Sequence, residues 1–130
     1  MKNFRKKVPQ RKLYSEYVKM MNGYFGLSKR EAEVYSFIVK LDSEWSAKSD
    51  KDFKDILSST YRKLIIRECN INKTNLSKLI IDFRNKGLIA TNKDGGSEIP
   101  NNIALDINEK IIETVFTFEV IEDEGTRSNN

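Results

Sequence analysis

Five polar or basic residues lie close together between positions 73 and 78 of this chain, and their types suit binding: Lys73, Thr74, Asn75, Ser77 and Lys78. The side-chain amide of asparagine pairs with adenine through two hydrogen bonds, and a lysine ammonium group reaches guanine or a phosphate. Threonine and serine hydroxyls contact phosphates or base edges. The cluster therefore predicts a surface that binds double-stranded DNA.

The composition argues against catalysis and against metal chemistry. The chain has no histidine, which excludes Ser-His-Asp and Cys-His sites and imidazole ligands. Its single cysteine, Cys69, excludes a disulfide within one chain and a multi-cysteine zinc site, and we expect it to be a small buried hydrophobe. Gly95 and Gly96 lack the strand-to-helix context of a phosphate-binding loop. We therefore expect a protein that is not an enzyme, with no metal and no small-molecule cofactor.

Six further cations are expected to contact the DNA backbone. Arg84 and Lys86 follow the cluster at the end of the same predicted helix, and Lys93 lies on a predicted hairpin tip. The N-terminal arm, which would enter a minor groove or lie along the phosphates, adds three more: Arg5, Lys6 and Lys7. With roughly six to eight cations engaged, binding without base contacts should be weak and sensitive to salt.

Positive charge is concentrated in two regions that the formal net charge of +4 conceals. Residues 1–12 hold six lysines and arginines and no acid, and residues 60–93 hold eight against two acids. Residues 94–130 carry nine acids against two cations. Basic blocks attract polyanions, whereas an acidic block repels them. We therefore expect one face for nucleic acid and an opposite, acidic face for protein.

Helical periodicity explains the start of the chain. Apolar residues from Leu13 to Met21 recur at helical spacing, and Asn22-Gly23 together with Gly26 should end that helix. Residues 28–31 form a capping box, in which a serine hydroxyl and a glutamate carboxylate each accept a hydrogen bond from the other residue's backbone amide. The helix that this box opens should end before a polar loop at residues 42–49.

Two further helical stretches are expected before the polar cluster. The first covers residues 53–57, with its apolar residues inward and a cap at Asp50 or Asp52. Residues 58–60 should interrupt it, and the helical period resumes from Tyr61 to Glu68. A short polar break then leads to the helix that carries the cluster.

That helix is expected to run from Lys73 to about Lys86. Asn72 is a good N-cap, and Gly87 stops the helix at a position that tolerates positive φ. Three apolar residues at helical spacing should face the core: Leu76, Ile80 and Phe83. If they do, the five polar residues face outward over the first two turns, where a helix docked in a major groove needs them.

The rest of the chain alternates as strands do. Residues 88–91 predict a strand, residues 93–97 a hairpin tip, and residues 103–107 a return strand. Thr114 to Ile121 is β-branched, aromatic and alternating, which favours one more strand. Its exposed edge would offer a place for a neighbouring molecule to pair.

From Leu64 to Ile89 the chain resembles the winged helix-turn-helix superfamily. Leu64 and Ile65 stand where the first helix of the motif packs, Ile71 fills the turn, and Lys86-Gly87-Leu88-Ile89 matches a common ending. The resemblance implies an α+β, mainly α fold with three or four helices and a β-hairpin wing, to which we add a C-terminal strand. It is closest to phage and plasmid proteins of transcription regulation or replication initiation, and implies a small DNA-binding protein encoded by a phage or mobile element.

The chain is expected to divide into four parts. Residues 1–12 form a flexible basic arm, residues 13–108 the winged-helix domain, residues 109–124 a C-terminal extension, and residues 125–130 a polar tail. No apolar run approaches the ~20 residues that span a membrane, and the N-terminus lacks the apolar stretch of a secretory signal. With one free cysteine, this predicts a location in the host cytoplasm, or in a virion.

Plainer interpretations of the same features stay open. Charges on a helix face are commonly only solvated, and a basic arm is commonly a disordered tail. Ile81 falls on the outward side of the predicted DNA-binding helix, where an apolar residue suits a protein partner better than a phosphate. The alternative function is therefore a protein–protein adaptor, or a structural component of a virion or polymerase assembly, and a homodimer or larger assembly fits either function.

Overall fold

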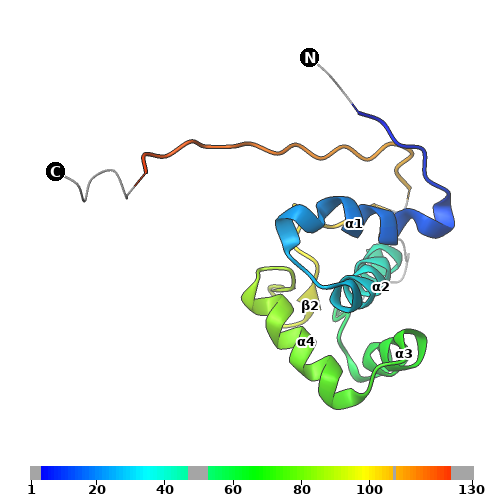
Figure 1. The fold of residues 1–130 in the computed structure, drawn as a ribbon. Coiled ribbons are helices and arrows are strands. Elements are labelled where there is room, and N and C mark those ends of the chain that lie inside the picture. The colour runs from blue at the N-terminus through cyan, green and yellow to red at the C-terminus, as the bar shows by residue number, and fades with distance from the viewer. Residues whose placement is uncertain (1–3, 47–52, 107, 124–130) are drawn as a thin grey trace.

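Helices precede a small hairpin in this α+β, mainly helical fold (Figure 1). The structure is a computed structural model, and it describes residues 4–46, 53–106 and 108–123. After a 3-10 turn, η1 (Gln10–Lys12), these residues form four α-helices: α1 (Leu13–Phe25), α2 (Lys29–Ser46), α3 (Ser59–Cys69) and α4 (Lys73–Asn85). An antiparallel pair of short strands follows: β1 (Ala90–Thr91) and β2 (Ser97–Glu98).

The first helix is longer than its sequence predicts. Asn22 and Gly23 lie inside α1, which ends at Gly26 with a φ of 66°. Asn22 explains the difference, because its side chain accepts a hydrogen bond from the Leu27 amide and donates one to the Leu27 carbonyl oxygen, both at 2.9 Å. The capping box is confirmed: the Ser28 amide donates to Glu31 Oε1 at 2.8 Å, and the Glu31 amide donates to Ser28 Oγ at 3.2 Å.

The loop expected at residues 42–49 is wrong over its first half, because α2 continues to Ser46. Asp42 is buried, and its Oδ1 accepts hydrogen bonds from the Ile99 amide at 3.0 Å and from Lys54 Nζ at 2.8 Å. Asp42 and Ser43 face the interior because distant parts of the chain supply their partners, which local composition cannot reveal. The predicted caps Asp50 and Asp52 lie outside the described residues.

The helix expected at residues 53–57 is also wrong. The chain there runs beside β2, and the Ile56 amide donates to the Ser97 carbonyl oxygen at 3.0 Å. Ile56 and Leu57 are buried as expected, whereas Phe53 is 53% exposed. Ser58 does not interrupt a helix but is the N-cap residue of α3. The pairing with β2 decides the conformation of this segment, and that partner lies some forty residues further along the chain.

The turn between α3 and α4 follows the prediction closely. Asn70 adopts the left-handed conformation at the end of α3, with a φ of 51°. The side chain of Asn72 caps α4 by accepting a hydrogen bond from the Asn75 amide at 2.7 Å. Gly87 takes a φ of 74° just beyond α4. The three apolar residues expected to face the core are all buried: Leu76, Ile80 and Phe83.

The hairpin is tighter than its sequence predicts. The return strand expected at residues 103–107 is wrong, because Ala90 pairs with Glu98 and Thr91 with Ser97 instead. Gly96 allows this arrangement, since a Cβ atom there would lie 1.9 Å from the Lys54 carbonyl oxygen. Residues 101–103 form a turn, and the apolar residues after Pro100 pack on the core without a strand partner.

Three aromatic rings join α1, α2 and α4 in the core. Tyr35 of α2 lies between Phe25 and Phe83, with ring centroids 5.5 and 5.1 Å apart. Its hydroxyl donates to the Leu88 carbonyl oxygen at 2.7 Å, and burial raises the pKa of this phenol. Tyr17 of α1 makes a similar bond to the Ile103 carbonyl oxygen at 2.7 Å. These two hydrogen bonds hold the chain after α4 against α1 and α2.

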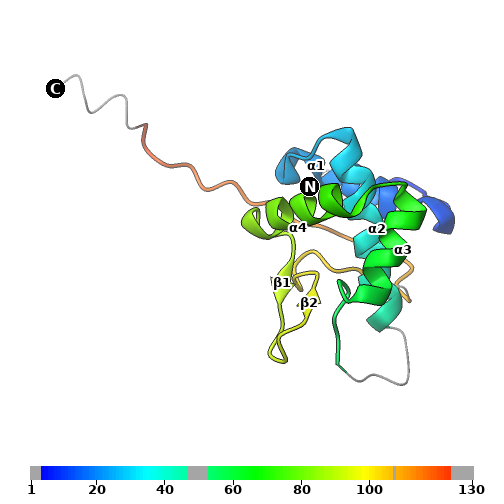
Figure 2. The same cartoon turned by 90° about the horizontal axis from the view of Figure 1, so that it is seen from below.

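Residues 108–123 leave the helical body as an extended chain (Figures 1 and 2). The strand expected from Thr114 to Ile121 is wrong, since nothing in the described part of the chain pairs with it. Phe118 and Val120 are 91% and 93% exposed. A strand pattern alone forms no sheet without a second strand beside it. Among the described helices, none is long and apolar enough to cross a membrane.

Candidate nucleic-acid interface

The outward stripe of α4 is a line of residues at helical spacing, Thr74, Lys78, Ile81 and Asn85, all of them exposed. Their exposure follows from the buried residues of α4, because 100° per residue turns this stripe away from the core. Helices α3 and α4 lie on the side of the molecule opposite to α1 (Figure 1). The stripe is therefore presented on a surface that no described helix covers.

The predicted cluster lies on or beside this stripe. Lys73, Thr74, Asn75 and Lys78 are exposed, and Ser77 is half-buried on the side toward the hairpin. Neither lysine makes an ion pair or hydrogen bond with another described residue. The cap uses the backbone amide of Asn75, so the side-chain amide of this residue keeps its own donors and acceptor.

An open groove of about 440 Å³ runs along one flank of α4. It separates α4 from the start of α2 and from the turn after α3. Its lining mixes amides, two cations and one carboxylate: Arg30, Asn70, Ile71, Asn72, Asn75, Lys78, Leu79 and Asp82. The carboxylate of Asp82 makes the part of the groove that it lines unsuitable for a phosphate. Contacts to an anion are therefore favoured in the part that Asn75 and Lys78 line.

Arg30 holds the turn in front of this groove. Its guanidinium group donates hydrogen bonds to the carbonyl oxygens of Cys69 and, at 2.9 Å, of Asn70. A cation at a helix C-terminus satisfies the last carbonyl groups and the negative end of the helix dipole. Sequence analysis missed this residue, and the only available signal was its charge at the start of a helix, which is not specific.

A second, open depression on α3 has two cations, Lys63 and Arg67, in its lining. The depression has a volume of about 430 Å³ and is lined by Thr60, Tyr61, Lys63, Leu64 and Arg67. Lys63 and Arg67 are exposed, and Arg67 forms a salt bridge with Glu68, with Nη2 and Oε1 3.2 Å apart. Sequence analysis counted both cations in a basic region but did not select them as site residues. Because both are exposed on α3, which precedes α4 in the chain, they are candidates for phosphate contacts.

Two residues predicted to contact the DNA backbone, Arg84 and Lys86, form hydrogen bonds within the protein instead. Arg84 donates to Thr91 Oγ1 at 3.2 Å and to Ser97 Oγ, and so ties α4 to the hairpin. Lys86 donates from Nζ to the Gly26 carbonyl oxygen at 2.9 Å. Both residues are exposed, but their hydrogen bonds hold α4 against its neighbours.

Lys93 is exposed at the hairpin tip, next to Asp94. Asn92 shapes this tip, because its Oδ1 accepts hydrogen bonds from the amides of Asp94 and Gly96, both at 3.0 Å. Its Nδ2 donates to the Lys54 carbonyl oxygen at 2.7 Å. Sequence analysis placed the tip correctly but missed the role of Asn92, for which the signal was an asparagine two residues before an Asp-Gly pair.

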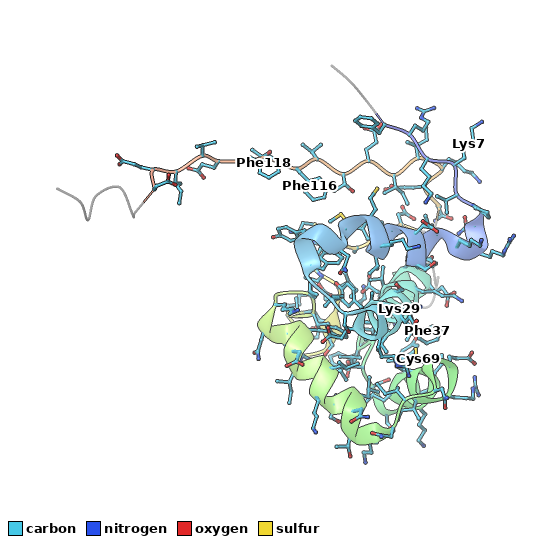
Figure 3. All side chains as sticks on the ribbon, in the orientation of Figure 1. Lys7, Lys29, Phe37, Cys69, Phe116 and Phe118 are labelled. Carbon is cyan, nitrogen blue, oxygen red and sulfur yellow. The ribbon has the colours of Figure 1, made fainter. Side chains whose placement is uncertain are left out.

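The basic arm is not brought to α4. Arg5, Lys6 and Lys7 lie beyond the start of α1, and Figure 3 places Lys7 at the side opposite to α4. Lys6 forms an ion pair with Glu16 at 2.7 Å, which lowers the pKa of that carboxyl group. The structure therefore separates two groups of cations that the sequence placed in one interface.

Cys69, the last residue of α3, is half-buried (Figure 3). Burial raises the pKa of its thiol, so the reactive thiolate is disfavoured at neutral pH. Within residues 4–46, 53–106 and 108–123, no three acidic or cysteine side chains come close enough to hold a metal ion.

Comparisons of the chain with protein-family models, with curated proteins and with solved structures found no significant match.

Proposed function

We propose that this protein binds double-stranded DNA by placing the first two turns of α4 in a major groove. The observation that carries this proposal is the exposed group of Lys73, Thr74, Asn75 and Lys78 on a helix start that is capped from within. Short polar and basic side chains at this position suit contacts to base edges.

The arrangement of the elements supports a winged helix-turn-helix assignment. The order α2, segment 54–57, α3, α4, β1 and β2 is the one expected of a winged helix, with segment 54–57 beside β2 through the hydrogen bond from the Ile56 amide to the Ser97 carbonyl oxygen. In this assignment α3 and α4 form the helix-turn-helix, and the tip at Lys93 is the wing. Arg30 and Asn72 stabilise the turn that sets the angle between the two helices.

The side chains divide into two roles in this proposal. Thr74, Asn75 and Lys78 contact base edges, because they lie on the outermost part of α4. The phosphates are contacted from both sides of the groove by Lys63, Arg67, Lys73 and Lys93. We leave Arg84, Lys86 and the N-terminal arm out of this surface, because the first two hold the fold together and the arm lies on the other side.

A helix that reads base edges suits a regulator of transcription or an initiator of replication, as the resemblance to phage and plasmid winged helices implies. Both processes need a protein that finds one DNA sequence among many. The proposal therefore includes a preferred DNA sequence, with specific binding several orders of magnitude tighter than binding to random DNA.

A salt titration of binding to a labelled duplex of random sequence tests the DNA proposal. With phosphate contacts from the four cations of the proposed surface, the logarithm of the association constant should fall with the logarithm of salt concentration with a slope of roughly −4. Fluorescence anisotropy measures this slope directly. No binding at about 50 mM salt, or a slope near zero, would contradict the proposal.

One observation favours a second function, in which α4 docks on another protein. Ile81 is 58% exposed in the middle of the outward stripe, and Asp82 beside it is also exposed. This pair suits an adaptor, or a structural component of a virion or polymerase assembly, better than it suits a phosphate backbone. Ile81→Ser should then weaken capture of a protein partner, whereas in the DNA function this uncharged replacement should leave phosphate contacts intact.

A further inference from the structure

The extension, residues 108–123, carries apolar side chains that find almost no contact in their own chain. Ile112 packs against the core and Thr114 is half-buried, but exposure then rises to 53% at Phe116 and 91% at Phe118. Val120 is 93% exposed. These residues alternate, so one edge of an extended chain carries all five. The three exposed apolar side chains of this set, Phe116, Phe118 and Val120, mark an interaction site.

The length of the extension explains why its own body does not cover it. The extension runs beside α1 in Figure 1 and continues past the end of that helix. The thirteen residues of α1 span about 20 Å at 1.5 Å per residue. An extended chain of the length of residues 108–123 spans about 50 Å. Figure 3 shows Phe118 further along this chain than Phe116, away from the helices.

The charge of the extension selects its partner. Five acids and one lysine make it strongly acidic: Glu109, Glu113, Glu119, Glu122, Asp123 and Lys110. Two copies of such a segment repel each other, so pairing of one extension with another is disfavoured. A basic surface with exposed apolar residues is the complementary surface.

The face of α1 that looks away from the core has this character. Met20 and Tyr24 are 59% and 71% exposed, one helical turn apart. Lys19 is exposed next to Met20, and further exposed cations lie in the N-terminal arm and in η1, before α1 begins: Arg5, Lys7, Arg11 and Lys12. The apolar pair and these cations match the alternating phenyl rings and the acids of the extension.

We propose that the protein forms a homodimer in which the extension of each copy docks on the outer face of α1 of the other. Phe116 and Phe118 cover Met20 and Tyr24 of the second copy, and the acids lie among its arm cations. The two contacts are equivalent, as a two-fold axis requires. This proposal is independent of DNA binding, because α4 lies on the opposite side and stays open (Figure 1).

The available area is sufficient for such a dimer. The rings of Phe116 and Phe118 would remove roughly 500 Å² of apolar surface from water over two copies. An equal area is lost by the surfaces they cover, and the neighbouring Val120 and acids add to it. The total reaches the ~1,200 Å² at which stable interfaces begin.

Sedimentation equilibrium of the full chain tests the proposal with the wild type and three variants. We expect the wild type at twice its monomer mass, and Phe118→Asp to weaken dimerisation at least tenfold. Val115→Asp is the matched control, since Val115 is 87% exposed on the opposite edge of the same segment, and it should dimerise like the wild type. Met20→Asp should dissociate like Phe118→Asp. Circular dichroism should show unchanged helix content in all of them.

Mixing the two dissociated variants provides the sharpest result. Phe118→Asp has an intact α1 face and Met20→Asp an intact extension, so an equimolar mixture should form dimers through one contact. A monomeric wild type at 100 µM would overturn the proposal, as would equal dissociation by Val115→Asp. If only Phe118→Asp dissociates, the extensions pair with each other and the α1 site is wrong. Binding of a monomer to anionic or neutral vesicles would identify a lipid surface instead and overturn it too.

Discussion

Lys86 donates a hydrogen bond from Nζ to the carbonyl oxygen of Gly26 at 2.9 Å, and so joins the end of α4 to the end of α1. The two residues are sixty positions apart in the sequence. The bond satisfies a carbonyl group at a helix C-terminus with a cation, which is a favourable arrangement. A lysine that the sequence pattern places in a DNA interface therefore helps to fix the orientation of α4.

Lys86→Met should accordingly change stability more than DNA affinity. The bond is exposed, so its loss should cost less than about 1 kcal/mol of unfolding free energy. Affinity for duplex DNA should change by less than threefold, which anisotropy measures at fixed salt. Lys78→Met is the matched variant, and it should show the reverse: unchanged stability and an affinity at least fivefold lower. Equal losses of affinity in both variants would show that Lys86 contacts DNA and would contradict its purely structural role.

Asn72→Ala should destabilise the protein by about 1 kcal/mol, because the Asn72 side chain caps α4 through the Asn75 amide. Ser58→Ala provides the control: Ser58 is the N-cap residue of α3, but its side chain makes no capping bond. Its replacement should cost less than half as much. Urea unfolding followed by circular dichroism measures both values. A larger loss at Ser58 would contradict the account of the helix starts.

Gly96→Ala should destabilise the protein by roughly 2 kcal/mol, since the new Cβ would meet the Lys54 carbonyl oxygen at 1.9 Å and push segment 54–57 from the hairpin. Gly23→Ala should do the opposite. Gly23 lies inside α1 with open space around it, so alanine should stabilise the helix by about 0.5–1 kcal/mol. Thermal unfolding of the two variants checks the opposite signs, and a stabilised Gly96→Ala protein would refute the close approach.

The capping box of α2 should make stability depend on pH. The Ser28 amide donates to Glu31, which lowers the pKa of that carboxyl group in the folded state. A carboxyl group with a lowered pKa stabilises the fold above its unfolded pKa, and this contribution disappears as pH falls through the folded pKa. Glu31→Gln should thus be less stable than the wild type at pH 7, by a few tenths of a kcal/mol because solvent screens the charge. The difference should disappear as the pH falls through the lowered folded pKa, and urea titrations over a series of pH values measure it.

Local signals in the sequence were sufficient where a residue acts on its near neighbours. Asn72, the Ser28–Glu31 box and Gly87 act within four residues, and the structure has each of them as predicted. The core face of α4 also follows from periodicity alone. These parts are predictable because helix caps and helical spacing depend on short stretches of chain.

The errors occur where the deciding partner is distant in the sequence. The sequence predicts a loop at Asp42, which the structure places inside α2, because its partners, Lys54 and the Ile99 amide, are further along the chain. The conformation of segment 54–57 depends on Ser97 in the same way. For the candidate site, the exposed cluster on α4 was predictable, whereas the engagement of Arg84 in hydrogen bonds to the hairpin was not. The charge of a side chain indicates that it can bind an anion. It does not indicate whether the side chain already forms hydrogen bonds within the protein.

The affinity of Lys78→Glu for duplex DNA, measured by anisotropy at about 50 mM salt, tests the central claim most directly. Lys78 is exposed at the centre of the proposed α4 surface, and Lys110→Glu makes the same change of charge on the extension. We predict that Lys78→Glu weakens binding at least tenfold, while Lys110→Glu stays within twofold of the wild type. Equal affinities for the two variants, with intact folds, would contradict DNA binding by α4.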